Sequence, residues 1–264
     1  LETDLITPTT KLMTRGKYTY WQDYQPACWI YNQGGGSHGS INVSQALRDS
    51  CNYFYYTVGD MLSIEQLDVV AKAMGLGEAT GIELGEQIGS LAGPDHRADL
   101  HGLEWQPTDT IAAAIGQSDN AFTPLQLGVY VSTLVGGGNR YAAHLLMKVR
   151  DFSTRTDTVV TSPRIVSRFT LPESHRLTVI DGMEQMVATS SEVSRYMKNV
   201  PVTVAGKTGT AQTGSKSTEN GLFICAAPSR NPEIVVVSVI ERAGGGSYSA
   251  MSAGDVLAAY YKNK

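Results

Sequence analysis

Three apolar, β-branched runs follow one another in the last third of this chain, and they constrain its fold more than any other feature. They are VTVAGKTGTAQ (202–212), GLFICAAP (221–228) and EIVVVSVIE (233–241). β-Branched and aromatic residues favour strands, and SRNP (229–232) is typical of a tight turn. The sequence therefore predicts three consecutive strands, the last two of which form an antiparallel hairpin.

Helical patterns occupy most of the chain before these strands, and one more follows them. Apolar positions at helical spacing and flanking cap residues predict helices over 41–62, 63–75, 108–116, 123–135, 171–188 and 249–261. Asn42 with Gln45, and Ser63 with Gln66, have the spacing of capping boxes. Residues 1–40 have few periodic runs and predict an irregular segment. This order of elements indicates an α+β fold in which helices cover an antiparallel sheet.

Length and charge narrow the class of protein. The 264 residues suffice for one large domain or two small ones, and a hydrophobic content of 42% favours a folded globular chain. The net charge of −4 gives no reason to expect nucleic acid as a partner. No apolar run approaches the length that spans a bilayer, so any membrane tether of the parent protein is expected outside this sequence.

The cysteines and histidines do not form a recognisable metal motif. Cys28, Cys51 and Cys225 contain no Cys-x-x-Cys pair, and a disulfide between Cys28 and Cys51 remains open. The five histidines, none paired at ligand spacing, are His38, His96, His101, His144 and His175. The sequence therefore predicts no metal site.

Lys207, between Gly206 and Thr208 in the first predicted strand, has three interpretations. A phosphate-binding loop needs a glycine five residues before Gly206, but Pro201 stands there and offers no backbone N–H. A lysine facing solvent on a strand is the simplest interpretation if KTGT is considered alone. The third interpretation, a catalytic strand, requires a partner motif elsewhere in the chain.

Ser50-Cys51-Asn52 is a candidate for that partner motif. Taken alone, Ser-x-Asn in a helical segment indicates a polar break or cap, because both side chains compete for backbone hydrogen bonds. Together with the later KTGT, it matches the second and third motifs of the serine acyl-transferases that include penicillin-binding proteins.

Longer stretches extend this match over most of the chain. They are GSHGSINVSQALRDSCNYFYYTVG, MGLGEATGIELGEQIG, DTIAAAIGQSDNAFTPLQLGVYVSTLVGGGNRY, AGKTGTAQ and NGLFICAAPSRNPEIVVVSVIE, from about residue 36 onward. On these stretches the chain resembles the transpeptidase domain of class B penicillin-binding proteins, of the penicillin-binding protein 2 type. The resemblance implies an α/β structure of the α+β type, as in penicillin-binding transpeptidases and serine β-lactamases. Its antiparallel sheet would have about five strands, with covering helices and a mostly helical subdomain.

The resemblance also implies a reaction and its partners. The reaction is that of a D,D-transpeptidase, which cross-links peptidoglycan stem peptides ending in D-Ala-D-Ala by serine acyl transfer, is acylated by β-lactam antibiotics and needs no cofactor. The parent protein would be anchored in the bacterial membrane, with this domain on the extracytoplasmic face among cell-wall synthesis proteins. A serine β-lactamase, a β-lactam sensor and a non-catalytic peptidoglycan-binding relative are the alternatives.

Three residues take catalytic roles by this resemblance: Ser50, Asn52 and Lys207. The Ser50 hydroxyl both donates and accepts, so it can relay a proton toward a leaving group. The Asn52 amide can bind the peptide carbonyl of the substrate. The Lys207 ammonium favours an anionic carboxylate and lowers the proton affinity of a neighbour.

Three further residues would bind the substrate or a β-lactam: Thr208, Gly209 and Thr210. The two threonine hydroxyls can donate to a carboxylate. Gly209 lets a substrate backbone lie close to the strand, because it has no Cβ. By resemblance, the backbone N–H of Thr210 forms half of the oxyanion hole.

The family's nucleophile, in a Ser-x-x-Lys motif, is missing from the sequence. No serine is followed by lysine three residues later, and the nearest imitation runs from Thr14 to Lys17 in the irregular segment. LETDLITPTTKL (1–12) resembles the end of the helix that follows the motif. We therefore expect residues 1–264 to be a partial transpeptidase domain that lacks this upstream segment and cannot acylate alone. A naturally non-catalytic relative is the alternative.

Several residues near these motifs have simpler interpretations as structural ones. IGQSDN (115–120) predicts a turn more strongly than a cleft lining, and Gly244–Gly246 predicts a loop. Tyr53, Tyr55 and Tyr56 are expected in the core, and Cys51 is expected to be a small packed side chain.

Overall fold

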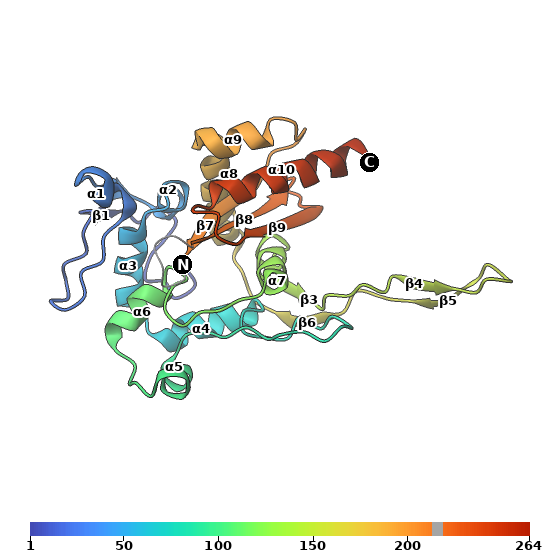
Figure 1. The fold of residues 1–264 in the computed structure, drawn as a ribbon, viewed down its shortest axis with the longest axis horizontal. Coiled ribbons are helices and arrows are strands. Elements are labelled where there is room, and N and C mark those ends of the chain that lie inside the picture. Colours follow the sequence, from blue (N-terminus) through green and yellow to red (C-terminus); the bar gives the residue numbers. More distant parts are fainter. Residues whose placement is uncertain (213–218) are drawn as a thin grey trace.

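The computed structural model describes residues 1–212 and 219–264 (Figure 1). A central sheet with helices on both faces forms one part of the molecule, and a mostly helical part lies beside it. A two-stranded arm, formed by β4 (Lys148–Arg150) and β5 (Asp157–Val160), projects far from the body. This arrangement agrees with the α+β architecture predicted from the order of elements and with the helical subdomain that the resemblance implies.

The central sheet has three antiparallel strands in the order β7–β8–β9. The strands are β7 (Ala205–Ala211), β8 (Asn220–Ala227) and β9 (Ile234–Ile240). Lys207 pairs with Ile224, and Ile224 pairs in turn with Val237. The three predicted strands and the predicted hairpin of the last two are therefore confirmed.

Alternate residues of β8 face opposite sides of the sheet, and each side has its own helices. The covering helices are α7 (Pro124–Val135), α8 (Glu173–Thr189), α9 (Ser191–Met197) and α10 (Ser247–Lys262). Phe223 and Cys225 pack into a core with α8, α9 and α10. Ile224 and Ala226 pack on the other side with α7 and α8. The sheet is thus buried on both faces, which fixes the position of β7.

The helical part contains six helices of the described chain. They are α1 (Trp29–Gly34), α2 (Val43–Arg48), α3 (Asn52–Met61), α4 (Ile64–Ala73), α5 (Pro94–His101) and α6 (Pro107–Ala113). The absence of a side chain at Gly59 lets α3 approach α6 closely, because a Cβ there would lie 2.6 Å from the Ala114 Cβ. Phe54 of α3 is fully buried among apolar neighbours.

The predicted helix over 41–62 is two helices, and this prediction was wrong in one respect. α2 ends at Arg48 and α3 begins at Asn52, with Ser50 in the break between them. The predicted start is correct, since the Asn42 side chain accepts a hydrogen bond from the Gln45 N–H at 3.0 Å. The apolar spacing continues through the break, so it does not reveal the interruption.

The expected sheet of about five strands is three-stranded in the part of the chain that the structure describes. The other strands pair in twos: β1 (Leu12–Thr14) with β2 (Gly39–Ile41), β3 (Asn139–Tyr141) with β6 (Ile165–Arg168), and β4 with β5. These six strands have three or four residues each, against seven or eight in the central sheet, and none of them pairs with β7, β8 or β9. Within residues 1–212 and 219–264, no helix is both long and apolar enough to cross a membrane.

Candidate active site

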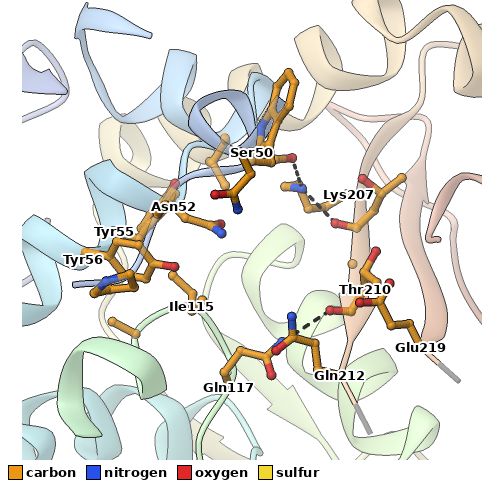
Figure 2. Close-up of a pocket in the computed structure, with 18 of the residues that line it drawn as sticks. Ser50, Asn52, Tyr55, Tyr56, Ile115, Gln117, Lys207, Thr210, Gln212 and Glu219 are labelled. Carbon is orange, nitrogen blue, oxygen red and sulfur yellow. Dashed lines mark hydrogen bonds between the residues drawn. The ribbon is translucent and has the colours of Figure 1, made fainter. Parts of the chain in front are cut away.

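A cleft of about 870 Å³ lies between the helical part and β7 (Figure 2). All six residues predicted from the motifs line it: Ser50, Asn52, Lys207, Thr208, Gly209 and Thr210. The cleft brings together the α2–α3 break, the turn after α6 and strand β7, which are far apart in the sequence. The structure therefore brings the two motifs together in one groove.

Ser50 owes its position to the break between α2 and α3. Its backbone has a φ of +50°, in the left-handed region that costs a residue other than glycine about 1–2 kcal/mol. The N–H groups of Ser50 and Cys51 donate to the carbonyls of Leu47 and Ala46 and so close α2. The break leaves the Ser50 side chain pointing across the cleft toward Lys207 (Figure 2). Such strain at a cleft is a common feature of functional sites.

Lys207 connects the two motifs directly. Its Nζ donates to Ser50 Oγ at 2.6 Å and to the Thr208 carbonyl at 2.8 Å, across a sequence separation of 157 residues for Ser50. An ammonium has three donor protons, so one remains for a ligand. Burial lowers the pKa of Lys207 to about 8, because desolvation disfavours the charged form. The lysine is therefore mostly protonated at neutral pH and close to titration.

Glycines allow β8 and the loop at 244–246 to pack closely against β7. A Cβ on Gly206 would lie 2.7 Å from the Phe223 ring, and one on Gly246 would lie 2.4 Å from the Gly209 carbonyl oxygen. The predicted loop at 244–246 is confirmed, and it sits directly on the backbone of β7. A Cβ on Gly209 would meet only Leu222, at an ordinary 3.6 Å. Packing within the protein therefore does not require glycine at position 209.

Gln117 lies in the segment 115–120, for which the sequence favoured a turn over a cleft lining, and the structure gives it both roles. The predicted turn at 115–120 is present, but Ile115 and Gln117 also line the cleft. The Gln117 Nε2 donates to the Thr210 carbonyl at 3.3 Å (Figure 2). Gly116, which has a φ of +79°, indicates a loop, and loops often carry functional residues. The sequence does not indicate that this loop contacts β7.

Aromatic residues form one wall of the cleft. Tyr55 and Tyr56 line it from α3, and Trp29 lines it from α1. Tyr56 is only 4% exposed and contributes to the core, as predicted. The Tyr55 hydroxyl is buried and has no hydrogen-bond partner among the described residues. These two tyrosines therefore contribute both to the core and to the wall of the cleft.

A thiol–imidazole cluster lies behind Ser50 and was not predicted. Cys28, His38 and Cys51 bring their ligand atoms within 4.8 Å of one another, and both thiols are buried. Thiol and imidazole groups are the ligands that zinc prefers, so these residues could hold a metal ion. The expectation of no metal site relied on sequence spacing, which does not reveal groups gathered by the fold.

Both thiols of this cluster are free, so the disulfide left open by the sequence is not formed here. A hydrogen bond from Cys51 lowers the pKa of Cys28, and the same pairing raises the pKa of Cys51. The Cys51 side chain is fully buried, which agrees with the small packed residue expected at this position.

Comparison with known proteins decides the family. The family model described as "Penicillin binding protein transpeptidase domain" matches residues 1–262 of this chain. The chain belongs to the penicillin-binding protein transpeptidase family. The family that the Ser-x-Asn and KTGT motifs indicated is thus confirmed.

Curated relatives of this transpeptidase-family chain are longer proteins. It is 27% identical over 278 residues to the peptidoglycan D,D-transpeptidase MrdA of Haemophilus influenzae, covering 99% of this chain and 42% of the relative. It is 29% identical over 241 residues to the stage V sporulation protein D of Bacillus subtilis, covering 87% and 35%. The chain therefore spans less than half the length of these relatives.

Solved structures agree on the fold. PBP2 of Pseudomonas aeruginosa matches with a TM-score of 0.84 and 24% identity, over 98% of this chain and 55% of that one. Penicillin-binding protein 2B of Streptococcus pneumoniae matches with a TM-score of 0.81 and 23% identity, over 99% and 45%. The fold is that of the penicillin-binding transpeptidases, as the motifs predicted.

Proposed function

We propose that this chain is part of a D,D-transpeptidase that cross-links peptidoglycan stem peptides by serine acyl transfer and is acylated by β-lactams. The 2.6 Å hydrogen bond from Lys207 Nζ to Ser50 Oγ carries this proposal, because it joins the two motifs in one cleft. Family membership and relatives named peptidoglycan D,D-transpeptidase support the reaction class.

Ser50, Lys207 and Asn52 would handle the proton and the leaving group. When the acyl-enzyme forms, the amine of the last D-alanine leaves and needs a proton, which the Ser50 hydroxyl is positioned to relay. Lys207 donates to Ser50 and keeps positive charge beside it. The Asn52 carboxamide faces the same space and would bind the peptide carbonyl of the substrate (Figure 2).

Strand β7 would hold the acyl donor through Thr208, Gly209 and Thr210. The carboxylate of the D-Ala-D-Ala end would meet Lys207 and the threonine hydroxyls, and the substrate backbone would run past Gly209, which has no side chain to obstruct it. The Thr210 N–H would bind the oxyanion. Losing one such donor costs about 3 kcal/mol of transition-state stabilisation.

The attacking serine and its lysine base would come from a Ser-x-x-Lys segment that does not occur in these 264 residues. We therefore regard residues 1–264 as a partial domain that cannot be acylated alone. The residues present here would bind and orient the substrate, and that segment would supply the attacking group and its base.

The setting proposed for the parent protein is the extracytoplasmic face of a bacterial membrane. PBP2 of Helicobacter pylori has been solved in complex with MreC, and another similar structure belongs to a peptidoglycan synthase complex. Penicillin-binding protein A of Mycobacterium tuberculosis has been solved as an imipenem acyl-enzyme. By analogy, the partners would be other cell-wall synthesis proteins, stem peptides and β-lactams.

Labelling with fluorescent penicillin tests this function. We expect no covalent labelling of residues 1–264 alone, and stoichiometric labelling of the parent protein that includes a Ser-x-x-Lys segment. Lys207→Ala in that parent should reduce the labelling rate at least tenfold, while Lys11→Ala, outside the cleft, should not change it. Absence of labelling in a folded parent with the motif would contradict the proposal, and rapid drug hydrolysis would favour a β-lactamase.

A further inference from the structure

The edge of β7 away from β8 directs its backbone groups toward the cleft. All seven residues of β7 pair with β8, and no strand among residues 1–212 and 219–264 pairs with its other edge. In an antiparallel ladder, alternate residues direct their N–H and C=O groups away from the partner strand. The carbonyls of Thr208 and Thr210 both accept side-chain donors from the cleft, so these two residues form the outward set.

An extended peptide added to this edge would need the Thr210 carbonyl. Strand addition works through main-chain hydrogen bonds, and the outward C=O of Thr210 is the acceptor for a peptide N–H. In the structure that acceptor is already taken by the Gln117 carboxamide at 3.3 Å. A carbonyl oxygen has two lone pairs, but the Gln117 side chain reaches this one from the cleft, from which a peptide would also approach, so the two would compete for the same access to the oxygen.

The backbone of Gln117 is fixed, so its side chain is the part that can give way. The Gln117 N–H donates to the Ala112 carbonyl at 3.1 Å, and its carbonyl accepts from the Asn120 amide at 3.0 Å. Asn120 also accepts from the Ala92 N–H at 3.0 Å, which ties the turn to the chain before α5. The carboxamide, in contrast, reaches β7 through one long and solvent-accessible hydrogen bond, which is weak.

We propose that Gln117 is a positioning residue that latches the substrate edge of β7 by occupying the Thr210 carbonyl in the free protein. The inference rests on the proposed function, because it assumes a peptide acyl donor that lies along β7. An incoming peptide N–H replaces the Gln117 amide on this oxygen, so binding requires the side chain to rotate away. The latch lowers the affinity of ligands that must displace the Gln117 side chain, such as an extended peptide with an N–H at this point.

Peptide binding to residues 1–264 tests the latch. The probe is a tripeptide ending in D-Ala-D-Ala, with its affinity and association rate measured by NMR titration and stopped-flow. Removing one exposed hydrogen bond should tighten binding roughly two- to tenfold. We expect this gain for Gln117→Ala and also for Gln117→Met, which keeps the length of the side chain but has no donor. Gln87→Met, at an exposed position outside the cleft lining, is the matched control.

The outcomes separate the latch from the proposed function. Equal or weaker binding by both Gln117 variants, with wild-type melting temperatures, would overturn the latch but not the proposed function. A gain for Gln117→Ala alone would mean that side-chain bulk, not the hydrogen bond, limits binding, and would also overturn it. If the wild-type chain and all variants fail to bind the tripeptide, peptide binding at this edge is wrong and the proposed function loses its support as well.

Discussion

The Lys207 ammonium lies 2.6 Å from the Ser50 hydroxyl. The charged group of the KTGT motif is therefore held against the side chain of a serine whose own backbone is strained. The two residues approach each other from different parts of the fold, since β7 belongs to the sheet and Ser50 to the helical part. Changes at either residue should therefore alter the hydrogen bond between these two motifs.

The titration of Lys207 gives the first prediction. Since burial lowers its pKa to about 8 from 10.5, an NMR titration of lysine Nζ groups should show one lysine with a midpoint near pH 8. That signal should vanish in Lys207→Met, while a variant of an exposed lysine such as Lys11 should keep it. A set of lysines that all titrate above pH 10 would contradict the buried environment of Lys207.

The same pKa fixes the sign of a stability change with pH. Between about pH 8 and 10.5 the unfolded chain binds more protons at this lysine than the folded chain, so Lys207 makes the free energy of unfolding rise with pH. In Lys207→Met this contribution is absent. From pH 7.5 to pH 10, the free energy of unfolding measured with urea should therefore rise less, or fall more, in the variant than in the wild type.

Ser50 offers a matched pair of substitutions. Ser50→Gly and Ser50→Ala both remove the hydroxyl, but only glycine adopts a φ of +50° without strain. We expect Ser50→Gly to be more stable than Ser50→Ala by about 1 kcal/mol in chemical unfolding. In the parent protein, both should label with penicillin far more slowly than the wild type. Equal stability of the two variants would mean that the backbone at position 50 is not strained.

Two neighbouring glycines should behave very differently. A Cβ on Gly246 would lie 2.4 Å from the Gly209 carbonyl oxygen and 2.8 Å from that of Leu222, whereas one on Gly245 has nothing within 4 Å. Gly246→Ala must move backbone and should lower the free energy of unfolding by about 1–3 kcal/mol. Gly245→Ala should change it by less than about 0.5 kcal/mol. Thermal unfolding of both proteins checks this, and a similar loss in both would contradict the close packing on β7.

Metal binding by the thiol–imidazole cluster can be measured directly. Because Cys28, His38 and Cys51 lie within ligand distance of one another, we expect Zn²⁺ to raise the melting temperature of the wild type and a chelator to reverse the shift. Cys28→Ser and His38→Ala should each lose most of the shift, whereas Cys225→Ser, in the core of the sheet, should keep it. Equal shifts in all four proteins would indicate non-specific binding.

Local signals explain what could be predicted from the sequence. The strands of the central sheet follow from β-branched runs bounded by turn residues, and the caps at Asn42 and Ser63 follow from spacing alone, because each of these features lies within a few residues. The short helices α1, α5 and α9 were not predicted, because they have only six to eight residues and little helical periodicity.

Long-range geometry explains what was missed. The break at Ser50 is invisible in the apolar pattern, since α2 and α3 both continue the spacing. Gln117 meets Thr210 only because the turn after α6 lies opposite β7, and the sequence carries no record of that distance. Cys28 and Cys51 are brought together by the packing of α1 against the α2–α3 junction, which no spacing rule contains.

The projecting arm has a practical consequence. Met147 and Phe152 in this hairpin are 75% and 82% exposed, and the arm stands clear of the body in Figure 1. Its turn at 151–156 is therefore a suitable place to insert a reporter peptide or an affinity tag, because the residues of this hairpin belong neither to the cleft lining nor to the central sheet. Immobilised through that turn, the domain would present its groove to the surrounding solution.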